Sequence, residues 1–194
     1  GREPVPKISM RLAVQFISSL HSILVANPSD DVRWTLHRVL SRNGISNWQQ
    51  LCPYMPKAQH DYRDVGRIFN LKDGIIGCSV QTHTALRTTE SNTEESMLAI
   101  PFFDKNGTPV LMFFAHAQHP RYFSDECVKK LGEACSQFSE FLELLQKDSL
   151  YEVYNYPNDQ PVQIKRDILS DEDQYERLDI SVTPLSFGVY NFDS

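Results

Sequence analysis

Two nearly continuous apolar segments lie close together in the middle of the chain: SMLAIPFF at residues 96–103 and TPVLMFFA at residues 108–115. Residues 104–107, between them, read DKNG, and an Asn-Gly pair favours the positive φ angles of a tight hairpin turn. Strands that are apolar on both faces are usually buried on both faces. The pattern therefore predicts a central antiparallel hairpin, with helical cover on at least one side.

The segment directly after this hairpin is predicted to be a helix. Ser124 suits the N-cap position, and Asp125 and Glu126 put negative charge in the first turn, where the helix dipole favours it. Apolar residues then recur at helical spacing from Val128 to Leu145. We expect this apolar stripe to pack against the hairpin.

Two further helices are predicted nearer the N-terminus. Apolar residues recur with a helical period in residues 9–25 and give that segment one apolar face. Residues 29–43 are also predicted to be helical, because Ser29 suits an N-cap and Asn43-Gly44 suits the end of a helix.

The region between these helices and the hairpin contains two predicted short strands, at residues 48–54 and 66–71. The glycines at 74 and 77 bracket a tight turn or the start of a short helix. Residues 79–95 form a polar stretch that contains several threonines.

The composition is that of an ordinary globular protein. The chain has 194 residues, of which 41% are hydrophobic and 23% charged. No apolar run approaches the roughly 20 residues that a membrane-spanning helix needs. We expect an N-terminal amphipathic helix at 1–28, a central domain at 29–147 and an acidic, β-rich C-terminal extension at 148–194.

This C-terminal extension carries the excess negative charge. The net charge of the chain is −6, and residues 148–194 hold 3 of the 19 basic and 10 of the 25 acidic residues. An acidic surface disfavours nucleic acid and anionic lipid as partners. The extension is a candidate docking surface for a protein partner. Short strands are predicted at 162–169 and 178–182, and the aromatic residues of 184–194 predict a docked terminus.

The four cysteines are Cys52, Cys78, Cys127 and Cys135, and none of them forms a C-x-x-C motif. That spacing argues against a zinc knuckle or a thioredoxin-like site. Reduced thiols in a cytoplasmic protein are the simplest interpretation.

Taken together, these segments resemble a GAF domain, a small-molecule and dimerisation module of many signalling proteins. The resemblance covers roughly residues 30–147, and PAS domains have a similar layout. It implies an α+β fold, with a central antiparallel sheet of five to six strands and helices on both faces. It also implies a ligand cavity between the sheet and the segment after the glycine turn, here 79–95. The motifs that carry the resemblance are DGIIG at 73–77, MLAIPFF at 97–103, NGTPVL at 106–111 and FSDE at 123–126.

The chain departs from the well-characterised GAF chemistries. The signature of cyclic-nucleotide-binding members, asparagine-lysine with phenylalanine-aspartate-glutamate, is not found here. Bilin-binding members commonly attach their chromophore through a Cys-His pair, and the chain contains no such pair. The methionine sulfoxide reductases of this fold place a cysteine before the hairpin, whereas residues 87–93 read RTTESNT.

Candidate ligand-binding residues therefore come from the implied cavity segment and its surroundings. Arg87 and the neighbouring threonines offer a guanidinium and hydroxyls that could hold a carboxylate or a phosphate. Cys78 follows the glycine turn and would become reactive if a nearby cation lowered its pKa. No cofactor is identified, and the histidines at 83, 116 and 119 are interpreted as loop residues rather than metal ligands. The full set of candidates is Cys78, His83, Arg87, Thr88, Glu90 and His116.

Three functions are compatible with this reading. The leading hypothesis is a non-catalytic sensory or interaction domain of a larger, bacterial-type signalling protein, which binds a small ligand and forms a homodimer through its flanking helices. The second is a thiol-based redox enzyme or sensor that uses Cys78. The third is a structural protein-docking module whose pocket is filled by side chains.

Overall fold

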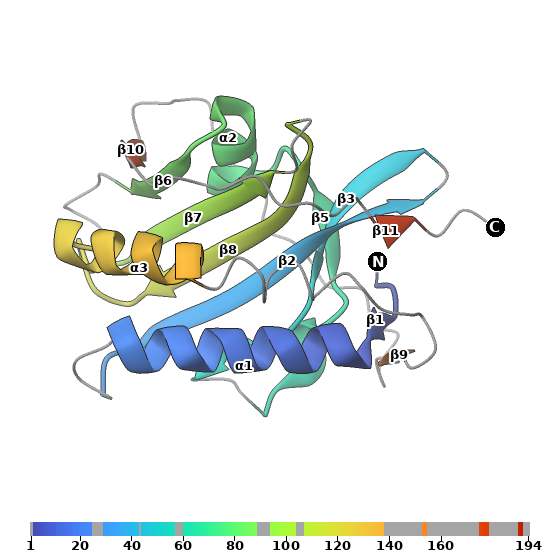
Figure 1. Ribbon diagram of the computed structural model, residues 1–194, viewed down its shortest axis with the longest axis horizontal. Helices are drawn as coiled ribbons and strands as arrows, with labels where there is room; N and C mark the ends of the chain where they lie inside the picture. The colour runs from blue at the N-terminus through green and yellow to red at the C-terminus, as the bar shows by residue number, and fades with distance from the viewer. Residues whose placement is uncertain are drawn as a thin grey trace.

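The computed structural model describes residues 2–24, 29–42, 44–56, 60–88, 94–103, 107–137, 153–154, 175–178 and 190–191. This part of the chain forms one large sheet with helices on both of its faces (Figure 1). The α+β layout agrees with the fold that the GAF resemblance implies.

The sheet is larger than the five or six strands expected, because short segments extend it. Strands β4 (Met55–Pro56) and β11 (Tyr190–Asn191) both pair with β2. All described pairings are antiparallel except that of β11 with β2. The main order across the sheet is β10 (Tyr175–Leu178), β6 (Ala85–Thr88), β7 (Ser96–Phe103), β8 (Pro109–Ala117), β2 (Val32–Arg42), β3 (Ile45–Gln50) and β5 (Ile68–Asn70).

The predicted central hairpin is confirmed as β7 and β8. Their register pairs Ser96 with Ala117 and Phe102 with Leu111. Successive side chains of a strand point to opposite faces, and both faces of this hairpin are buried. Apolar residues of the hairpin accordingly belong to two separate hydrophobic clusters, one on each side of the sheet.

The prediction of a helix at residues 29–43 is wrong, because this segment contains the long strand β2. Val32, Trp34 and Leu36 alternate with period two and all lie in the same hydrophobic cluster. Strand β2 pairs with β8 along one edge and with β3 along the other, so tertiary hydrogen bonding overrides the local helix signals. Gly44, read as a helix end, has a φ of 76° in the turn between β2 and β3.

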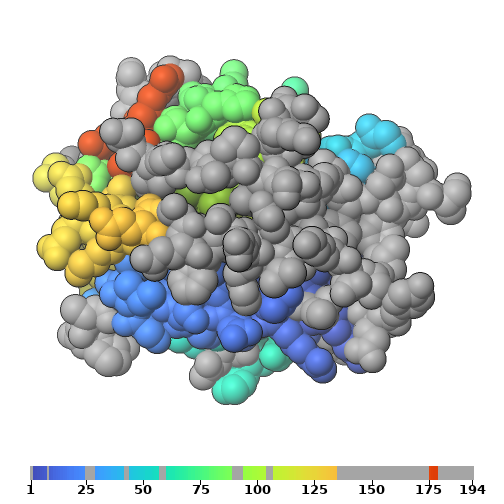
Figure 2. Space-filling view, in the orientation of Figure 1, coloured from blue at the N-terminus to red at the C-terminus, as the bar shows by residue number. Residues whose placement is uncertain are grey.

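Two helices cover one face of the sheet. The N-terminal helix α1 (Lys7–Leu24) confirms the predicted helix, and α3 (Asp125–Gln137) confirms the described part of the helix after the hairpin. Figure 2 shows α1 in blue and α3 in yellow to orange, side by side on this face. Residues 138–145 of the predicted helix lie outside the described residues.

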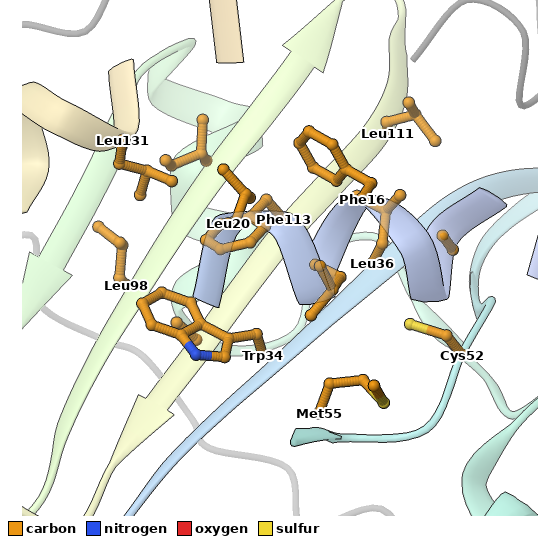
Figure 3. Packing of buried hydrophobic residues seen from close by; sticks show 14 of the residues in the cluster. Phe16, Leu20, Trp34, Leu36, Cys52, Met55, Leu98, Leu111, Phe113 and Leu131 are labelled. Atoms are coloured by element: carbon orange, nitrogen blue, oxygen red, sulfur yellow. The ribbon is translucent and has the colours of Figure 1, made fainter. Parts of the chain in front are cut away.

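The core between these helices and the sheet contains most of the large buried side chains. Phe16 and Leu20 of α1 lie in the same buried cluster as Trp34 of β2 and Phe113 of β8 (Figure 3). Leu131 of α3 joins the same cluster. The apolar stripe of α1 is therefore buried against the sheet of its own chain. Among the side chains of this helix that the structure describes, the exposed ones are Arg11, Gln15, Ser18, Ser22 and Ile23.

The opposite face of the sheet is covered by the helix α2 (Gly74–Thr82), which begins at the glycine turn noted in the sequence. Ile75 and Ile76 of this helix pack with Val39 and Met112 of the sheet in the second hydrophobic cluster. A 3-10 helix, η1 (Tyr62–Asp64), precedes β5. Of the two strands predicted here, that at 66–71 is confirmed as β5, and the other corresponds to β3, which starts earlier and ends at Gln50.

The described parts of the C-terminal extension are short strands. Strand β9 (Val153–Tyr154) pairs with β1 (Val5–Pro6), and β10 extends the edge of the sheet beside β6. Tyr190 and Asn191 pair with Leu40 and Ser41 of β2, so this part of the aromatic terminus is docked as predicted. The predicted strand at 162–169 lies outside the described residues, as does 179–182 of the other. Within the described residues, no helix is both long and apolar enough to cross a membrane.

Candidate functional site

A small cavity lies between the sheet and the first turn of α2. Its volume is about 120 Å³. Strands β2, β5, β7 and β8 supply one side of it, and α2 with the preceding Asp73 supplies the other. The lining residues are His37, Tyr54, Arg67, Phe69, Asp73, Gly74, Ile75, Ile76, Met97 and Phe114.

His37 is the most unusual of these residues. Its side chain is 1% exposed, and neither ring nitrogen has a hydrogen-bond partner among the described residues. Burial lowers the pKa of His37 to about 3, and the charge of Arg67 acts in the same direction. The backbone of Met112 opposes both as a weak hydrogen-bond partner, but its contact with the ring does not reach hydrogen-bond geometry. The imidazole is therefore neutral at physiological pH. A buried polar group without a partner costs about 1–3 kcal/mol, so a ligand that bonds to these nitrogens would remove that cost.

Arg67 supplies the positive charge of the cavity. Its guanidinium lies over the ring of Phe69, 5.4 Å from the ring centre, and Nη2 donates a 3.4 Å hydrogen bond to the hydroxyl of Tyr54. Its Nε is buried and has no partner in the described chain. Burial raises the pKa of Tyr54, so this hydroxyl stays protonated. Arg67 therefore keeps hydrogen-bonding capacity for a further group.

The N-terminus of α2 faces the same space. Gly74, Ile75 and Ile76 all line the cavity, and the amides of a first helical turn have no acceptor within their own helix. They carry a partial positive charge, which attracts anions. Asp73 is the N-cap residue, but its side chain makes no capping hydrogen bond. Gly77 is required here, because a Cβ at this position would lie 2.2 Å from the backbone of Lys72.

The remaining wall of the cavity is apolar. Phe69, Ile75, Ile76, Met97 and Phe114 supply carbon surface beside the polar groups. The ring of Phe69 also meets His37 edge-on, with 5.1 Å between ring centres and an interplanar angle of 87°. An apolar cavity with a few convergent polar groups is the usual architecture of a small-molecule site.

A second, larger cavity of about 480 Å³ lies where β6, β10 and the start of α3 meet. Arg87 of β6 lines it. Its lining residues are Arg87, Thr88, Ser96, Arg121, Phe123, Ser124, Asp125 and Glu176.

The guanidinium of Arg87 is already well bonded. It contacts Glu176 at 3.0 Å and Asp125 at 2.6 Å, and it donates a 2.9 Å hydrogen bond to the carbonyl of Phe123. Hydrogen bonding to Glu176 is the main cause that raises the pKa of Arg87, and Asp125 adds to it. Two carboxylates neutralise this cation, so its role here is to join β6, α3 and β10.

The candidate residues from the sequence are distributed over several places. Arg87 and Thr88 lie together on the larger cavity. His83 is the C-cap of α2, in the left-handed conformation, and its ring stacks on Phe103 at 4.3 Å. The interpretation of His116 as a loop residue is wrong, because it lies on β8, where it contacts the Glu95 carboxylate at 3.2 Å.

Of the other two candidates, Cys78 lies on α2, partly buried among residues of the second hydrophobic cluster, and lines neither cavity. Glu90 lies outside the described residues. The described cysteines form no disulfide bonds. Burial raises the pKa of Cys52 to about 11 and also raises that of Cys127, which disfavours the thiolate form of both. Within the described chain, no three His, Cys, Asp or Glu residues gather as metal ligands.

The polar groups of the small cavity were not among the candidates from sequence. His37 lies in the segment wrongly predicted as a helix, and Arg67 directly precedes β5, in a segment that carried no motif. Asp73 belongs to the DGIIG motif, which was used only as a fold signal. That motif could have indicated the site, because glycines at the first and fourth positions of a helix let its backbone amides approach neighbouring groups closely.

No protein-family model matches the chain, and no curated protein gives a significant match. Among solved structures, the chain is similar to a type II free methionine-R-sulfoxide reductase from Thermoplasma acidophilum, with 13% identity, a TM-score of 0.49 and coverage of 71% of this chain and 95% of the other.

Two further similar structures come from GAF proteins. The GAF domain of an Acinetobacter phosphoenolpyruvate-protein phosphotransferase is 16% identical, with a TM-score of 0.48 and coverage of 75% of this chain and 96% of the other. A putative GAF sensor protein from Burkholderia vietnamiensis is 15% identical, with a TM-score of 0.42 and coverage of 69% and 89%. At such identities and TM-scores, these likenesses carry no conclusion about the chemistry of this chain.

Proposed function

We propose that this chain is a sensory domain that binds a small molecule in the cavity between α2 and the sheet. The carrying observation is His37, which is buried at the cavity with both ring nitrogens unbonded among the described residues. Arg67 and the first turn of α2 add donors that face the same space. A buried polar group without a hydrogen-bond partner lowers the stability of the fold, and such groups at a cavity can bind and orient a ligand.

The N-terminal segment offers a route from the cavity to α1. Arg2 forms an isolated β-bridge with Arg67, and the Glu3 amide donates a 3.0 Å hydrogen bond to the carbonyl of Gly66. The segment then continues through β1 directly into α1, which begins at Lys7. A ligand that repositions Arg67 would therefore act on the start of α1. A ligand changes such an arrangement only by binding one state more tightly than another.

The hairpin phenylalanines do not occupy this cavity, with the exception of Phe114 in its wall. Phe102 and Phe113 point to the other face of the sheet, where they pack in the cluster with α1. This distribution favours a ligand-binding domain over a docking module with a filled pocket.

A thiol-based redox function is the weaker alternative. Cys78 lines neither cavity, and no second described cysteine is bonded to it. If Cys78 acts as a redox centre, Cys78→Ser should abolish turnover or peroxide response. Retention of ligand binding with Ser at this position, and no redox activity in the unaltered protein, would support the sensory function instead.

The direct test is a thermal-shift screen of small metabolites, together with native mass spectrometry of the purified protein. Met97→Phe, which adds bulk to the cavity wall, should abolish the response to any true ligand. Lys130→Gln, on the exposed side of α3, is the control and should respond as the unaltered protein does. A ligand response that Met97→Phe leaves intact would place binding elsewhere and overturn the proposal.

A further inference from the structure

The small cavity contains one cationic and one anionic side chain that are not paired with each other. Arg67 and Asp73 both line it. Within the described part of the chain, neither forms an ion pair, and Asp73 makes no capping hydrogen bond. Opposite charges that share a small space without contact are complementary to a ligand that carries both signs.

We infer that the ligand of this cavity is a small zwitterion, an α-amino acid with a compact apolar side chain. This inference rests on the proposed function and names the class of ligand. The carboxylate end is recognised by Arg67, by the first-turn amides of α2 and by the N–H of His37. The ammonium end is recognised by the carboxylate of Asp73.

The carboxylate end has the larger number of donors. The Nε of Arg67 has no partner in the described chain, and a guanidinium is well shaped to bind a carboxylate. The neutral imidazole of His37 has one N–H donor and one acceptor, and its pKa keeps it in that form. The amides of Gly74 and Ile75 add the partial positive charge of the helix end.

Asp73 decides between a zwitterion and a simple anion. A ligand with a carboxylate alone would leave Asp73 beside a second negative charge, whereas an amine alone would leave Arg67 without a counter-ion. Both alternatives leave one charge of the site unpaired, which is unfavourable in a partly buried space. Only a ligand with both groups satisfies both side chains.

The size and the apolar wall restrict the side chain of the ligand. An engineered cavity of about 150 Å³ accommodates benzene, which has six non-hydrogen atoms. The cavity here has a volume of about 120 Å³, so the expected occupant is close to alanine, which has six non-hydrogen atoms like benzene, and valine, which has eight, is the upper limit. Ile76, Met97 and Phe114 offer carbon surface for a short aliphatic group.

The test uses isothermal titration calorimetry with L-valine and its two truncated analogues, 3-methylbutanoate and 2-methylpropylamine. L-Alanine and L-leucine bracket the size. We expect at least one of the amino acids to bind, and L-valine to bind about 10- to 100-fold more tightly than either analogue, because each analogue lacks one charge-assisted interaction. This comparison needs only the unaltered protein.

Two substitutions then assign the ends of the ligand. Asp73→Asn should weaken L-valine binding about 10- to 100-fold and leave 3-methylbutanoate unchanged or tighter, whereas Arg67→Gln should weaken L-valine and spare 2-methylpropylamine. Arg11→Gln and Glu133→Gln remove charges at exposed positions and should change neither affinity.

Three results would overturn the inference. Equal affinity for L-valine and 3-methylbutanoate, with no effect of Asp73→Asn, would make the cavity a simple anion site. A neutral or singly charged hit from the metabolite screen that Met97→Phe abolishes, with no binding of any amino acid, would refute the zwitterion but leave the sensory function standing. Absence of binding by every compound in both experiments would refute both proposals.

Discussion

The indole nitrogen of Trp34 donates a hydrogen bond to Nδ1 of His21 over 2.9 Å and so joins the central strand β2 to helix α1. Trp34 is fully buried, and its ring also contacts Phe113 and Phe123. Burial lowers the pKa of His21, so this side chain is neutral and Nδ1 is available as an acceptor. A protonated His21 could not accept this bond.

Replacing His21 with Ala should therefore leave the indole N–H of Trp34 buried without an acceptor. We expect the free energy of unfolding to fall by about 1–3 kcal/mol, measured by urea denaturation at pH 7.5. Ser22→Ala, at the neighbouring exposed position, is the control and should stay within about 0.5 kcal/mol of the unaltered protein. Equal stability of the two variants would show that this hydrogen bond has no net effect.

His37→Leu should separate folding from binding. The apolar side chain has a similar volume and removes two unbonded nitrogens, so we expect the stability of the ligand-free protein to be unchanged or raised by up to about 2 kcal/mol. Ligand binding should be lost. Leu36→Ala, on the opposite face of the same strand, is the contrast and should cost about 2–5 kcal/mol. A strongly destabilised His37→Leu variant would mean that the nitrogens are bonded after all.

The pH dependence of stability should also report His37. In the unfolded chain this histidine takes up a proton near pH 6.5, whereas in the folded protein its pKa is about 3. Between these values the unfolded state binds more protons, so the free energy of unfolding falls as the pH is lowered, by up to about 1.4 kcal/mol per pH unit. This contribution of His37 to the pH dependence of stability is absent above pH 6.5.

His37→Leu lacks this titration, which makes it the reference for the measurement. Its stability relative to the unaltered protein should rise steadily from pH 6.5 to pH 4, in chemical denaturation at each pH. Parallel pH profiles for the two proteins would contradict a buried neutral His37.

The central hairpin, α1 and the start of α3 could be predicted from the sequence because their patterns are long and agree with their burial. Strand β2 could not, since Val32, Leu36 and Val39 fit a helical period as well as a strand, and Ser29 and Gly44 resemble helix ends. Trp34, which lies off the helical stripe, is the residue that distinguishes the two. Only pairing with β8 and β3, distant in the sequence, decides the conformation.

The site was less predictable than the fold. The GAF resemblance implied a cavity against residues 79–95, but none of these residues lines the small cavity. Its polar residues His37, Tyr54 and Arg67 come from separate strands and loops and share no sequence motif. The sequence favoured Arg87 as a ligand-binding residue, because the neighbouring threonines offer hydroxyl groups beside its guanidinium. In the structure the Arg87 guanidinium is paired with the carboxylates of Asp125 and Glu176, and Glu176 lies 89 residues away along the chain.

Gly66 provides a test of the route from the cavity to the N-terminus. A Cβ at this position would lie 2.6 Å from the carbonyl oxygen of Glu3, and the φ angle is 85°. We expect Gly66→Ala to displace the N-terminal segment and to lower stability by about 2–4 kcal/mol, from backbone strain and the clash together.

Gly44→Ala is the matched control, because φ is 76° and the space around it is open. The free energy of unfolding of this variant should fall by about 1–2 kcal/mol, the cost of placing a Cβ on a residue with positive φ. If ligand affinity changes with Gly66→Ala and not with Gly44→Ala, the N-terminal segment and the cavity are coupled. Identical behaviour of the two variants would argue against coupling.

Arg87→Gln should release β10 from the edge of the sheet. The side chain of Arg87 is 16% exposed and that of Glu176 51% exposed, so solvent weakens the pair and we expect a global cost of only about 1 kcal/mol. The local effect should be larger and visible as faster amide hydrogen exchange at Tyr175–Leu178. Unchanged exchange there would mean that backbone pairing with β6 alone holds this strand.

Helix α2 is short for the surface that it covers. Its nine residues span about 14 Å, whereas the eleven residues of β2 extend over about 36 Å. The cavity lies at one end of this helix, where its cover stops. An occupant would complete the layer, and at a concentration 100 times its dissociation constant it would add about 2.7 kcal/mol to the free energy of unfolding. The lifetime of the protein against proteolysis would then itself depend on the concentration of the compound, without any movement of the helices.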